Sequence, residues 1–238
     1  MIKPSPTLET PIIHLEKLEF IWEHLNTGSS IQYFWLKRQP FCPIWELQKQ
    51  LHSKRVAGEI PDIVLLLEHE HVYTFGKNAD TDLLLDSKPH DAEVVPIDRG
   101  GQVTYHGPGQ LVVYPILDLH NYQMSVSWYM RSLEGVIIHS LKKLGLIASR
   151  KKDLPGVWIG DEKICAMGVR LSRWVTMHGF ALNQKPNMKY FDGMIPCGIF
   201  NYGITSLQAQ GIEISMETLV ECIIASFILI FEGKNDEA

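Results

Sequence analysis

The chain has 238 residues and a formal net charge of −5 at pH 7, from 22 basic and 27 acidic side chains. With 45% hydrophobic and 21% charged residues, its composition excludes a disordered or fibrous protein. The acidic balance argues against a dedicated nucleic-acid binder, because such proteins carry a basic footprint. The length fits one large domain or two small ones.

Residues 1–30 are predicted to be an N-terminal extension of undefined packing, because residues 26–30 (Asn-Thr-Gly-Ser-Ser) have the composition of a linker. We find no secretory signal and no Arg-rich transit peptide in this stretch. The longest apolar run, residues 222–231, is too short for a hydrocarbon core of about 30 Å. We therefore expect a cytoplasmic protein that does not bind a membrane.

The first predicted helix begins at Pro43 and ends before Gly58, with Ile44, Leu47 and Leu51 on one face. Strands are predicted at residues 62–67, 72–75, 94–97 and 111–117. The first of these is almost entirely apolar and is expected in the centre of a sheet. Pro96 and Pro115 suggest edge positions or bends for the last two.

The second half of the chain continues the alternation of strands and helices. Ser125 can cap a helix that runs to residue 144, where Gly145 ends it, and Ser215 can cap a last helix through residue 231. Between them, residues 157–159 and 164–171 form a predicted hairpin. A strand at residues 174–183, interrupted by His178 and Gly179, follows. The pattern predicts an α/β fold with a mixed β-sheet flanked by helices.

Several motifs of known chemistry are absent from the sequence. Neither of the two Gly-Lys pairs belongs to a P-loop, because no glycine lies five residues before either pair. His69 and His71 would share one face of an extended segment, but two ligands do not make a metal site. A polar connection between strands explains them as well, and no metal site is predicted.

Residues 99–110 form an unusual loop with four glycines and Pro108. So many glycines cost backbone entropy unless the loop needs positive φ angles or close approach to a ligand. Arg99 offers a fixed cation, and Thr104 and His106 offer polar contacts. Glycine-rich turns also serve only to join strands, so composition alone leaves a binding loop and a plain connection equally open.

Of the four cysteines, Cys197 has the neighbours expected of a nucleophile. Pro196 fixes the backbone before it, and Gly198 allows a substrate to approach the sulfur. A thiol nucleophile also needs a partner that favours the thiolate. Lys163 is a candidate partner at the start of an apolar strand, where alternation would place it on the same face as Cys165.

Three segments together resemble the lipoyl(octanoyl) transferases of lipoate biosynthesis. They are residues 99–110 (Arg-Gly-Gly-Gln-Val-Thr-Tyr-His-Gly-Pro-Gly-Gln), residues 163–170 (Lys-Ile-Cys-Ala-Met-Gly-Val-Arg) with 178–183 (His-Gly-Phe-Ala-Leu-Asn), and residues 195–199 (Ile-Pro-Cys-Gly-Ile). The resemblance covers residues 31–232, which it identifies as the catalytic domain, and it implies the fold of biotin and lipoate protein ligase catalytic domains.

The resemblance also implies an activity and a site. The reaction would move octanoyl from octanoyl-acyl carrier protein to a lysine of a lipoyl domain, in 2-oxoacid dehydrogenase complexes or the glycine cleavage H protein, with no cofactor and no metal. Cys197 would be the acyl-thioester nucleophile and Lys163 would lower its pKa. Cys165 departs from the small residue, such as Ala, expected at that position, and the departure is conservative in size. The acyl substrate would contact Arg99, Gly100, Gly101, Gln102, Val103, Thr104, Tyr105 and His106, together with Ala166, Met167, Gly168, Gly179, Phe180 and Ala181.

Two alternatives share this fold. One is an ATP-dependent lipoate–protein ligase, which activates the free acid and needs no thiol nucleophile. The other is a non-catalytic module that binds a carrier protein. Cys197 argues against the first, and the intact set of Lys163, Cys197 and the glycine loop argues against the second.

Overall fold

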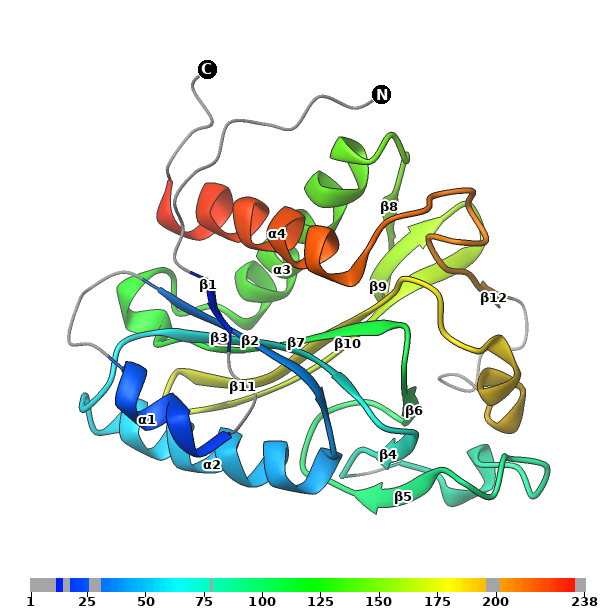
Figure 1. Cartoon of the computed structure of the whole chain (residues 1–238), viewed down its shortest axis with the longest axis horizontal. Helices are drawn as coiled ribbons and strands as arrows, with labels where there is room; N and C mark the ends of the chain where they lie inside the picture. Colours follow the sequence, from blue (N-terminus) through cyan, green and yellow to red (C-terminus); the bar gives the residue numbers. More distant parts are fainter. Residues whose placement is uncertain (1–11, 15–17, 26–30, 78, 196–201, 234–238) are drawn as a thin grey trace.

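A computed structural model describes residues 12–14, 18–25, 31–77, 79–195 and 202–233 (Figure 1). The strands are β1 (Ile12–His14), β2 (Gln32–Gln39), β3 (Ile63–His69), β4 (Val72–Phe75), β5 (Glu93–Pro96), β6 (Val103–His106), β7 (Gln110–Ile116), β8 (Ser149–Lys151), β9 (Leu154–Ile159), β10 (Glu162–Ser172), β11 (Val175–Asn183) and β12 (Gly203–Ile204). The α-helices are α1 (Ile21–His24), α2 (Phe41–Val56), α3 (Val126–Lys143) and α4 (Met216–Phe227).

The main sheet has the strand order β1-β2-β3-β7-β11-β10-β9-β8, and β12 pairs with β10. The sheet is mixed: β1, β2 and β3 are parallel, whereas β3, β7, β11, β10, β9 and β8 are antiparallel to their neighbours. Helices α3 and α4 cover one face, and α1 and α2 cover the other (Figure 1). The predicted α/β class, and the central position of the apolar strand at residues 62–67, are confirmed.

Two hydrophobic cores form because alternate residues of each central strand point to opposite faces. On β7, Leu111 and Val113 pack toward α3 and α4, while Val112 and Tyr114 pack toward α2. All four are at most 4% exposed. A central strand of this kind is apolar on both sides, which is why its sequence shows no polar alternation.

The predicted helix caps are confirmed. Ser125 Oγ accepts a hydrogen bond from the Trp128 amide at 3.2 Å, and Ser215 Oγ accepts one from the Thr218 amide at 3.1 Å. Gly145, with φ of 84°, follows the end of α3. The apolar run near the C-terminus forms α4 and a π-helical turn, Ile228–Glu232. Within the described ranges, no helix combines the length and the hydrophobicity that crossing a bilayer requires.

The edge position considered for Pro115 is wrong, because β7 lies between β3 and β11. The β7–β11 ladder stops at Val113, and Pro115, which has no N–H, lies beyond it. Thr176 fills the gap, since its hydroxyl donates to the Pro115 carbonyl and accepts from the Leu117 amide. Pro96, in contrast, lies in β5, an edge strand.

Two further predictions need correction. The loop at residues 99–110 contains a strand, β6, which pairs with β4 through four consecutive residues. The break expected at His178 and Gly179 is absent on one side of β11, because both residues pair with β10 there. His178 adopts φ of 60° within the strand, and its amide donates to the Gln48 side chain at 3.0 Å.

The sequence analysis missed strand β2, although Tyr33, Phe34, Trp35 and Leu36 form a buried, aromatic-rich run that favours a strand. β1 pairs with β2 in parallel, and Ile21 of α1 is fully buried. The described parts of residues 12–25 therefore pack against the main sheet. The domain boundary after residue 30 stays a prediction.

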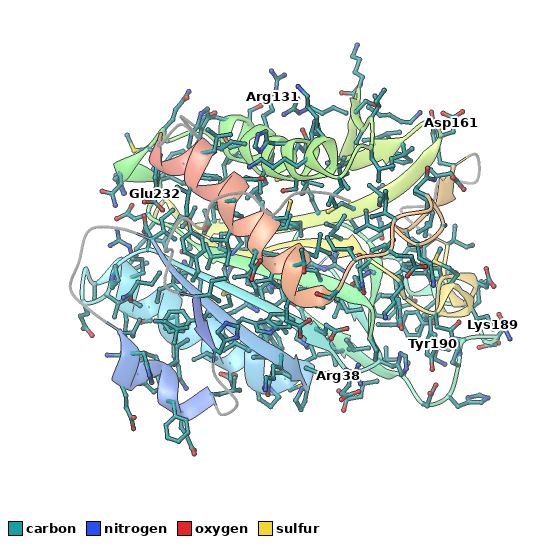
Figure 2. All side chains as sticks on the ribbon, turned by 45° about the horizontal axis from the view of Figure 1, so that its top comes forward. Arg38, Arg131, Asp161, Lys189, Tyr190 and Glu232 are labelled. Atoms are coloured by element: carbon teal, nitrogen blue, oxygen red, sulfur yellow. The ribbon has the colours of Figure 1, made fainter. Side chains whose placement is uncertain are left out.

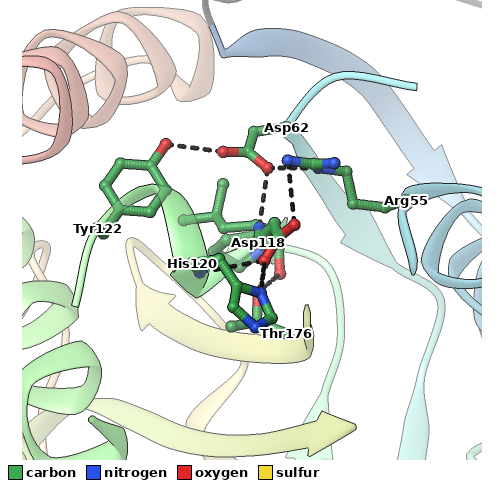
Figure 3. A network of polar contacts seen from close by, with 8 residues as sticks. Arg55, Asp62, Asp118, His120, Tyr122 and Thr176 are labelled. Atoms are coloured by element: carbon green, nitrogen blue, oxygen red, sulfur yellow. Dashed lines mark hydrogen bonds and ion pairs between the residues drawn. The ribbon is translucent and has the colours of Figure 1, made fainter. Parts of the chain in front are cut away.

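A buried polar network ties the N-terminal end of β3 to the loop after β7 (Figure 3). One oxygen of Asp62 accepts hydrogen bonds from Arg55 Nε at 2.7 Å and from the Asp118 amide at 2.8 Å. Its other oxygen accepts one from the Tyr122 hydroxyl at 2.8 Å. Asp62 is 6% exposed, so these partners replace the hydrogen bonds that water would otherwise make.

We expect Asp62→Ala to lower the free energy of unfolding by about 2–3 kcal/mol, because the Asp118 amide and the Tyr122 hydroxyl lose their acceptor and Arg55 keeps only its longer ion pair with Asp118, at 3.5 Å. Urea denaturation measures the loss. Glu59→Ala is the matched control: its ion pair with Lys54 is solvent-exposed and should contribute less than about 1 kcal/mol. Equal losses in the two variants would contradict the structural role of the network.

A small second sheet, β5-β4-β6, lies at the opposite end of β3 from this network. Its core contains Tyr73, Val103 and Tyr105, which pack against Tyr190 and Met194. Figure 2 shows Tyr190 and Lys189 at the same end of the molecule as Asp161, and Glu232 at the other end. The candidate site lies at the end that carries Tyr190.

Candidate functional site

A pocket of about 360 Å³, including its open mouth, lies between the main sheet and the small sheet. Its walls come from β7, β10 and β11 on one side and from β6 and the segment before it on the other. The lining residues are Phe41, Ile97, Arg99, Thr104, His106, Tyr114, Ala166, Met167, Gly168, His178, Gly179, Phe180 and Ala181.

Nine residues predicted to contact the acyl substrate line this pocket, and they come from three distant segments. They are Arg99, Thr104, His106, Ala166, Met167, Gly168, Gly179, Phe180 and Ala181. The others support the loop. Val103 and Tyr105 are buried in the core of the small sheet, Gln102 accepts a hydrogen bond from the Asp80 amide, and Gly101 has φ of 88°.

Four lining residues were not predicted: Phe41, Ile97, Tyr114 and His178. Phe41 begins α2, and Tyr114 faces the α2 side of β7. No local pattern indicated these roles, because the residues reach the pocket through sheet order. His178 directly precedes Gly179, which was predicted to contact the substrate. It also begins the segment 178–183 that resembles the transferases, and this position was the one sequence signal for its place at the pocket.

Two glycines allow the strands and the loop to approach each other. Gly168 and Gly179 face each other across β10 and β11. A Cβ on Gly168 would lie 3.1 Å from both the Arg99 side chain and the Gly100 carbonyl oxygen, and one on Gly179 would lie 2.1 Å from the Val113 carbonyl oxygen. Side chains at these positions would displace the loop or the strand.

Arg99 is held in one geometry beside the pocket. One terminal nitrogen donates to the Thr74 carbonyl at 2.7 Å and to its hydroxyl at 2.9 Å, and the other donates to the Gly100 carbonyl at 2.9 Å. Only 6% of the residue is exposed. The glycine loop therefore brings a fixed cation to the edge of an otherwise largely apolar pocket.

Three buried histidines lie at the pocket or beside it. His69 Nδ1 donates to the Gln39 carbonyl, so Nε2 accepts a hydrogen bond from the Tyr114 hydroxyl at 2.8 Å. Burial lowers the pKa of His69 to about 4 and that of His106 to about 3. Both rings are therefore neutral at pH 7.

His69 and His71 have separate hydrogen-bond partners and do not form a metal-binding pair. His71 contacts the Tyr105 hydroxyl through Nδ1 at 2.7 Å and stacks on the Tyr190 ring at 4.0 Å. Among the described residues, no three His, Cys, Asp or Glu side chains gather as a metal-binding group.

His178 donates through Nε2 to Asp98 at 3.1 Å, and Arg170 forms an ion pair with the same carboxylate. The hydrogen bond from His178 lowers the pKa of Asp98 to about 2. Burial lowers the pKa of His178, and this effect outweighs the opposing influence of Asp98. The pair is thus a neutral imidazole that donates to a carboxylate.

Asp98→Asn is expected to lower the free energy of unfolding by about 1 kcal/mol at neutral pH, a modest figure because a third of the side chain is exposed. The carboxylate is stabilised in the folded protein. Its contribution is therefore complete above the unfolded pKa of about 3.9 and disappears as pH falls through about 2. Urea denaturation of both proteins from pH 7 to pH 2 should show the gap closing; a constant gap would contradict the assignment.

A β-bulge turns Lys163 toward the pocket side of the sheet. Lys163 pairs with Trp158 and Cys165 with Val157, so Ile164 is the extra residue. Ile164 and Cys165 both pack in the core beneath α3 and α4. Lys163 therefore faces the other side, shared with Ala166, and the predicted common face with Cys165 is wrong.

The Lys163 ammonium lies over the ring of Trp158, with Nζ 4.7 Å from its centroid. The Trp158 ring packs against the Tyr202 ring, and the two form an aromatic cluster. Lys151 also contacts this cluster, with Nζ 4.6 Å from the centroid of the Tyr202 ring, and it forms an ion pair with Asp161. The electron-rich face of the indole attracts a cation in this position. This geometry keeps Lys163 on the same strand, and on the same face, as the pocket residue Ala166.

Cys197, with the rest of residues 196–201, lies outside the described residues. Of the described cysteines, Cys165 is buried, Cys222 is half-buried and Cys42 is exposed on α2. Burial raises the pKa of both Cys165 and Cys222, which disfavours their thiolates. Neither has the properties of a thiol nucleophile at neutral pH.

The described residues before and after residues 196–201 are held by backbone hydrogen bonds. The Ile195 amide donates to the Leu83 carbonyl at 2.8 Å. On the other side, β12 runs parallel to the start of β10, and the Thr205 amide donates to the Lys163 carbonyl at 3.0 Å. Residues 203–205 therefore lie directly beside the start of β10, next to Lys163.

Comparison with known proteins gives one consistent result. Residues 43–228 match the lipoyl protein ligase A/B catalytic domain. The chain is 40% identical to an octanoyltransferase of Caldanaerobacter subterraneus over 83% of this chain and 89% of that protein. It is 45% identical to an octanoyltransferase of Solibacter usitatus, over 83% of this chain and 91% of that one.

The fold is also similar to a solved structure, a bipartite lipoate protein ligase with its E2 lipoyl domain from Thermoplasma acidophilum. The TM-score is 0.65 at 15% identity, over 87% of this chain and 85% of that one. At this identity the similarity concerns the fold alone. The ligase-type architecture expected from the sequence is confirmed.

Proposed function

This chain belongs to the lipoyl protein ligase A/B catalytic-domain family and is an acyltransferase of protein lipoylation, and we propose that it transfers octanoyl from octanoyl-acyl carrier protein to a lipoyl-domain lysine through a thioester on Cys197. The observation that carries the proposal is the convergence of three distant segments on one pocket, beside the strand of Lys163. Acceptors would be the lipoyl domains of 2-oxoacid dehydrogenase complexes and the glycine cleavage H protein.

The first half-reaction exchanges one thioester for another. The Cys197 thiolate attacks the octanoyl carbonyl, the new carbon–sulfur bond forms, and the bond to the carrier's thiol breaks. The departing thiolate takes up a proton, which the ammonium of Lys163 can supply. Because the bonds formed and broken are of the same kind, this step needs no external source of energy.

The second half-reaction forms the product. The uncharged amine of the acceptor lysine attacks the acyl-enzyme, the amide bond forms, and Cys197 leaves as the thiolate. The proton lost by the amine can return to Lys163, which restores the ammonium for the next cycle. An amide is more stable than a thioester, so the reaction proceeds without ATP.

The pocket suits the acyl chain. Phe41, Ile97, Ala166 and Ala181 supply apolar walls. Each buried methylene of the chain would contribute about 0.8 kcal/mol. We propose that the chain lies against these walls while the glycine loop, fixed by Arg99, closes over the carbonyl end.

The competing function is an ATP-dependent lipoate–protein ligase of the same fold. A single assay separates the two: the protein is incubated with octanoyl-acyl carrier protein and an apo lipoyl domain without ATP. Mass spectrometry should show an octanoyl group on the lipoyl domain. If modification requires free octanoate and ATP instead, the proposed transfer is wrong.

A further inference from the structure

A chain of buried amides connects His106 to the backbone beside Lys163. His106 Nδ1 lies 2.8 Å from Gln110 Oε1, Gln110 Nε2 lies 2.9 Å from Asn183 Oδ1, and Asn183 Nδ2 lies 2.9 Å from the Thr205 carbonyl oxygen. Gln110 and Asn183 are direct cross-strand partners at the ends of β7 and β11. Both are at most 4% exposed, so water does not compete for these bonds.

The donor and the acceptor of each hydrogen bond in this series are fixed by its last member, the Thr205 carbonyl. A carbonyl oxygen only accepts, so Asn183 must donate to Thr205 and present its own oxygen to Gln110. Gln110 then donates to Asn183 and presents its oxygen to His106. Nδ1 of His106 therefore carries the proton, and Nε2 carries a lone pair.

That lone pair is available to a ligand. His106 lines the pocket, and its Nε2 has no hydrogen-bond partner in the described part of the chain. Burial holds the pKa of the ring at about 3, so the imidazole is neutral at pH 7. A carbonyl oxygen placed there would be repelled, whereas an N–H group would be bound.

We propose that Gln110 and Asn183 are positioning residues that lock His106 in the Nδ1–H tautomer, so that Nε2 accepts a hydrogen bond from a substrate N–H. The role deepens the proposed octanoyl transfer and rests on it. Two substrates carry such a group: the carrier's thiol-bearing arm, through its amide, and the attacking lysine, through its amine. Kinetics with each substrate varied in turn will distinguish the two sources.

The tautomer can be measured without any substrate. In the full chain labelled with ¹⁵N-histidine, two-bond proton–nitrogen spectra distinguish the two neutral tautomers, and His106→Gln identifies the His106 signals by their loss. We expect the Nδ1–H form in the wild type. Gln110→Met removes the acceptor and should lose that form, whereas Gln110→Glu keeps an acceptor oxygen and should retain a proton on Nδ1.

Activity gives the second readout. Gln110→Met should lower kcat/KM about tenfold, the effect of one lost hydrogen bond in a buried site, as a raised KM for whichever substrate supplies the N–H. Gln184→Met is the matched control. Gln184 is also a buried amide, donating to the Ile214 carbonyl, but it does not contact His106.

Three results would overturn the proposal. They are an Nε2–H or doubly protonated ring in the wild type, an unchanged tautomer in Gln110→Met, or equal kcat/KM in Gln110→Met and Gln184→Met. Because the spectra need no turnover, the tautomer can be established even if octanoyl transfer through Cys197 proves wrong.

Discussion

Cys197→Ala is expected to abolish octanoyl transfer, with turnover reduced by roughly 10⁴-fold or more, because the covalent route loses its nucleophile. The thermal midpoint should stay close to that of the wild type, since one small side chain replaces another. Transfer of octanoyl to an apo lipoyl domain, followed by mass spectrometry, measures the effect.

Cys42→Ala and Cys222→Ala serve as matched controls. Cys42 is exposed on α2, and Cys222 packs between α3 and α4, where its thiol lies 3.8 Å from the Ser140 carbonyl. Both variants should transfer octanoyl at near wild-type rates. If Cys197→Ala retains near-normal turnover, the covalent mechanism is wrong.

Lys163→Met is expected to reduce turnover by about 10²- to 10³-fold, within the usual range for a lost general acid–base group. The ammonium of Lys163 would also stabilise the Cys197 thiolate, so in the variant the thiol pKa should rise toward the ordinary value of about 8.5. Alkylation of Cys197 by iodoacetamide, followed against pH, should show its midpoint moving upward. Turnover should fall more than alkylation, because Lys163 also moves protons during aminolysis.

Lys151→Met is the control for Lys163→Met. Lys151 lies 5.5 Å from the centroid of the same Trp158 ring, so its loss perturbs the same aromatic cluster. Its ammonium is paired with Asp161, and we expect the alkylation midpoint of Cys197 to stay unchanged. An identical alkylation profile in wild type and Lys163→Met would remove Lys163 from the site.

The elements that sequence alone predicted are those specified locally. The caps at Ser125 and Ser215 and the apolar core of β3 depend on neighbouring residues, and each lies where it was expected. Strand β2 also carries a local signal, an aromatic-rich run that favours a strand, although no strand was predicted there.

The predictions that were wrong or absent concern features that depend on contacts between distant segments. Pro115 is tolerated in an interior strand because the β7–β11 ladder ends at Val113, and the Thr176 hydroxyl then pairs with the Pro115 carbonyl and the Leu117 amide. The bulge that turns Lys163 to the pocket side is set by its pairing with β9, which alternation within β10 cannot reveal. Phe41 and Tyr114 reach the pocket only through the order of the strands.

The acyl-enzyme itself is the most direct test of the proposed mechanism. The wild-type protein is mixed with octanoyl-acyl carrier protein alone, quenched in acid, and its intact mass is measured before and after an apo lipoyl domain is added. We expect a mass increase of one octanoyl group, located on the peptide that contains Cys197 and lost when the acceptor is added. Octanoyl transfer to the acceptor with no adduct on Cys197 would contradict the proposed mechanism.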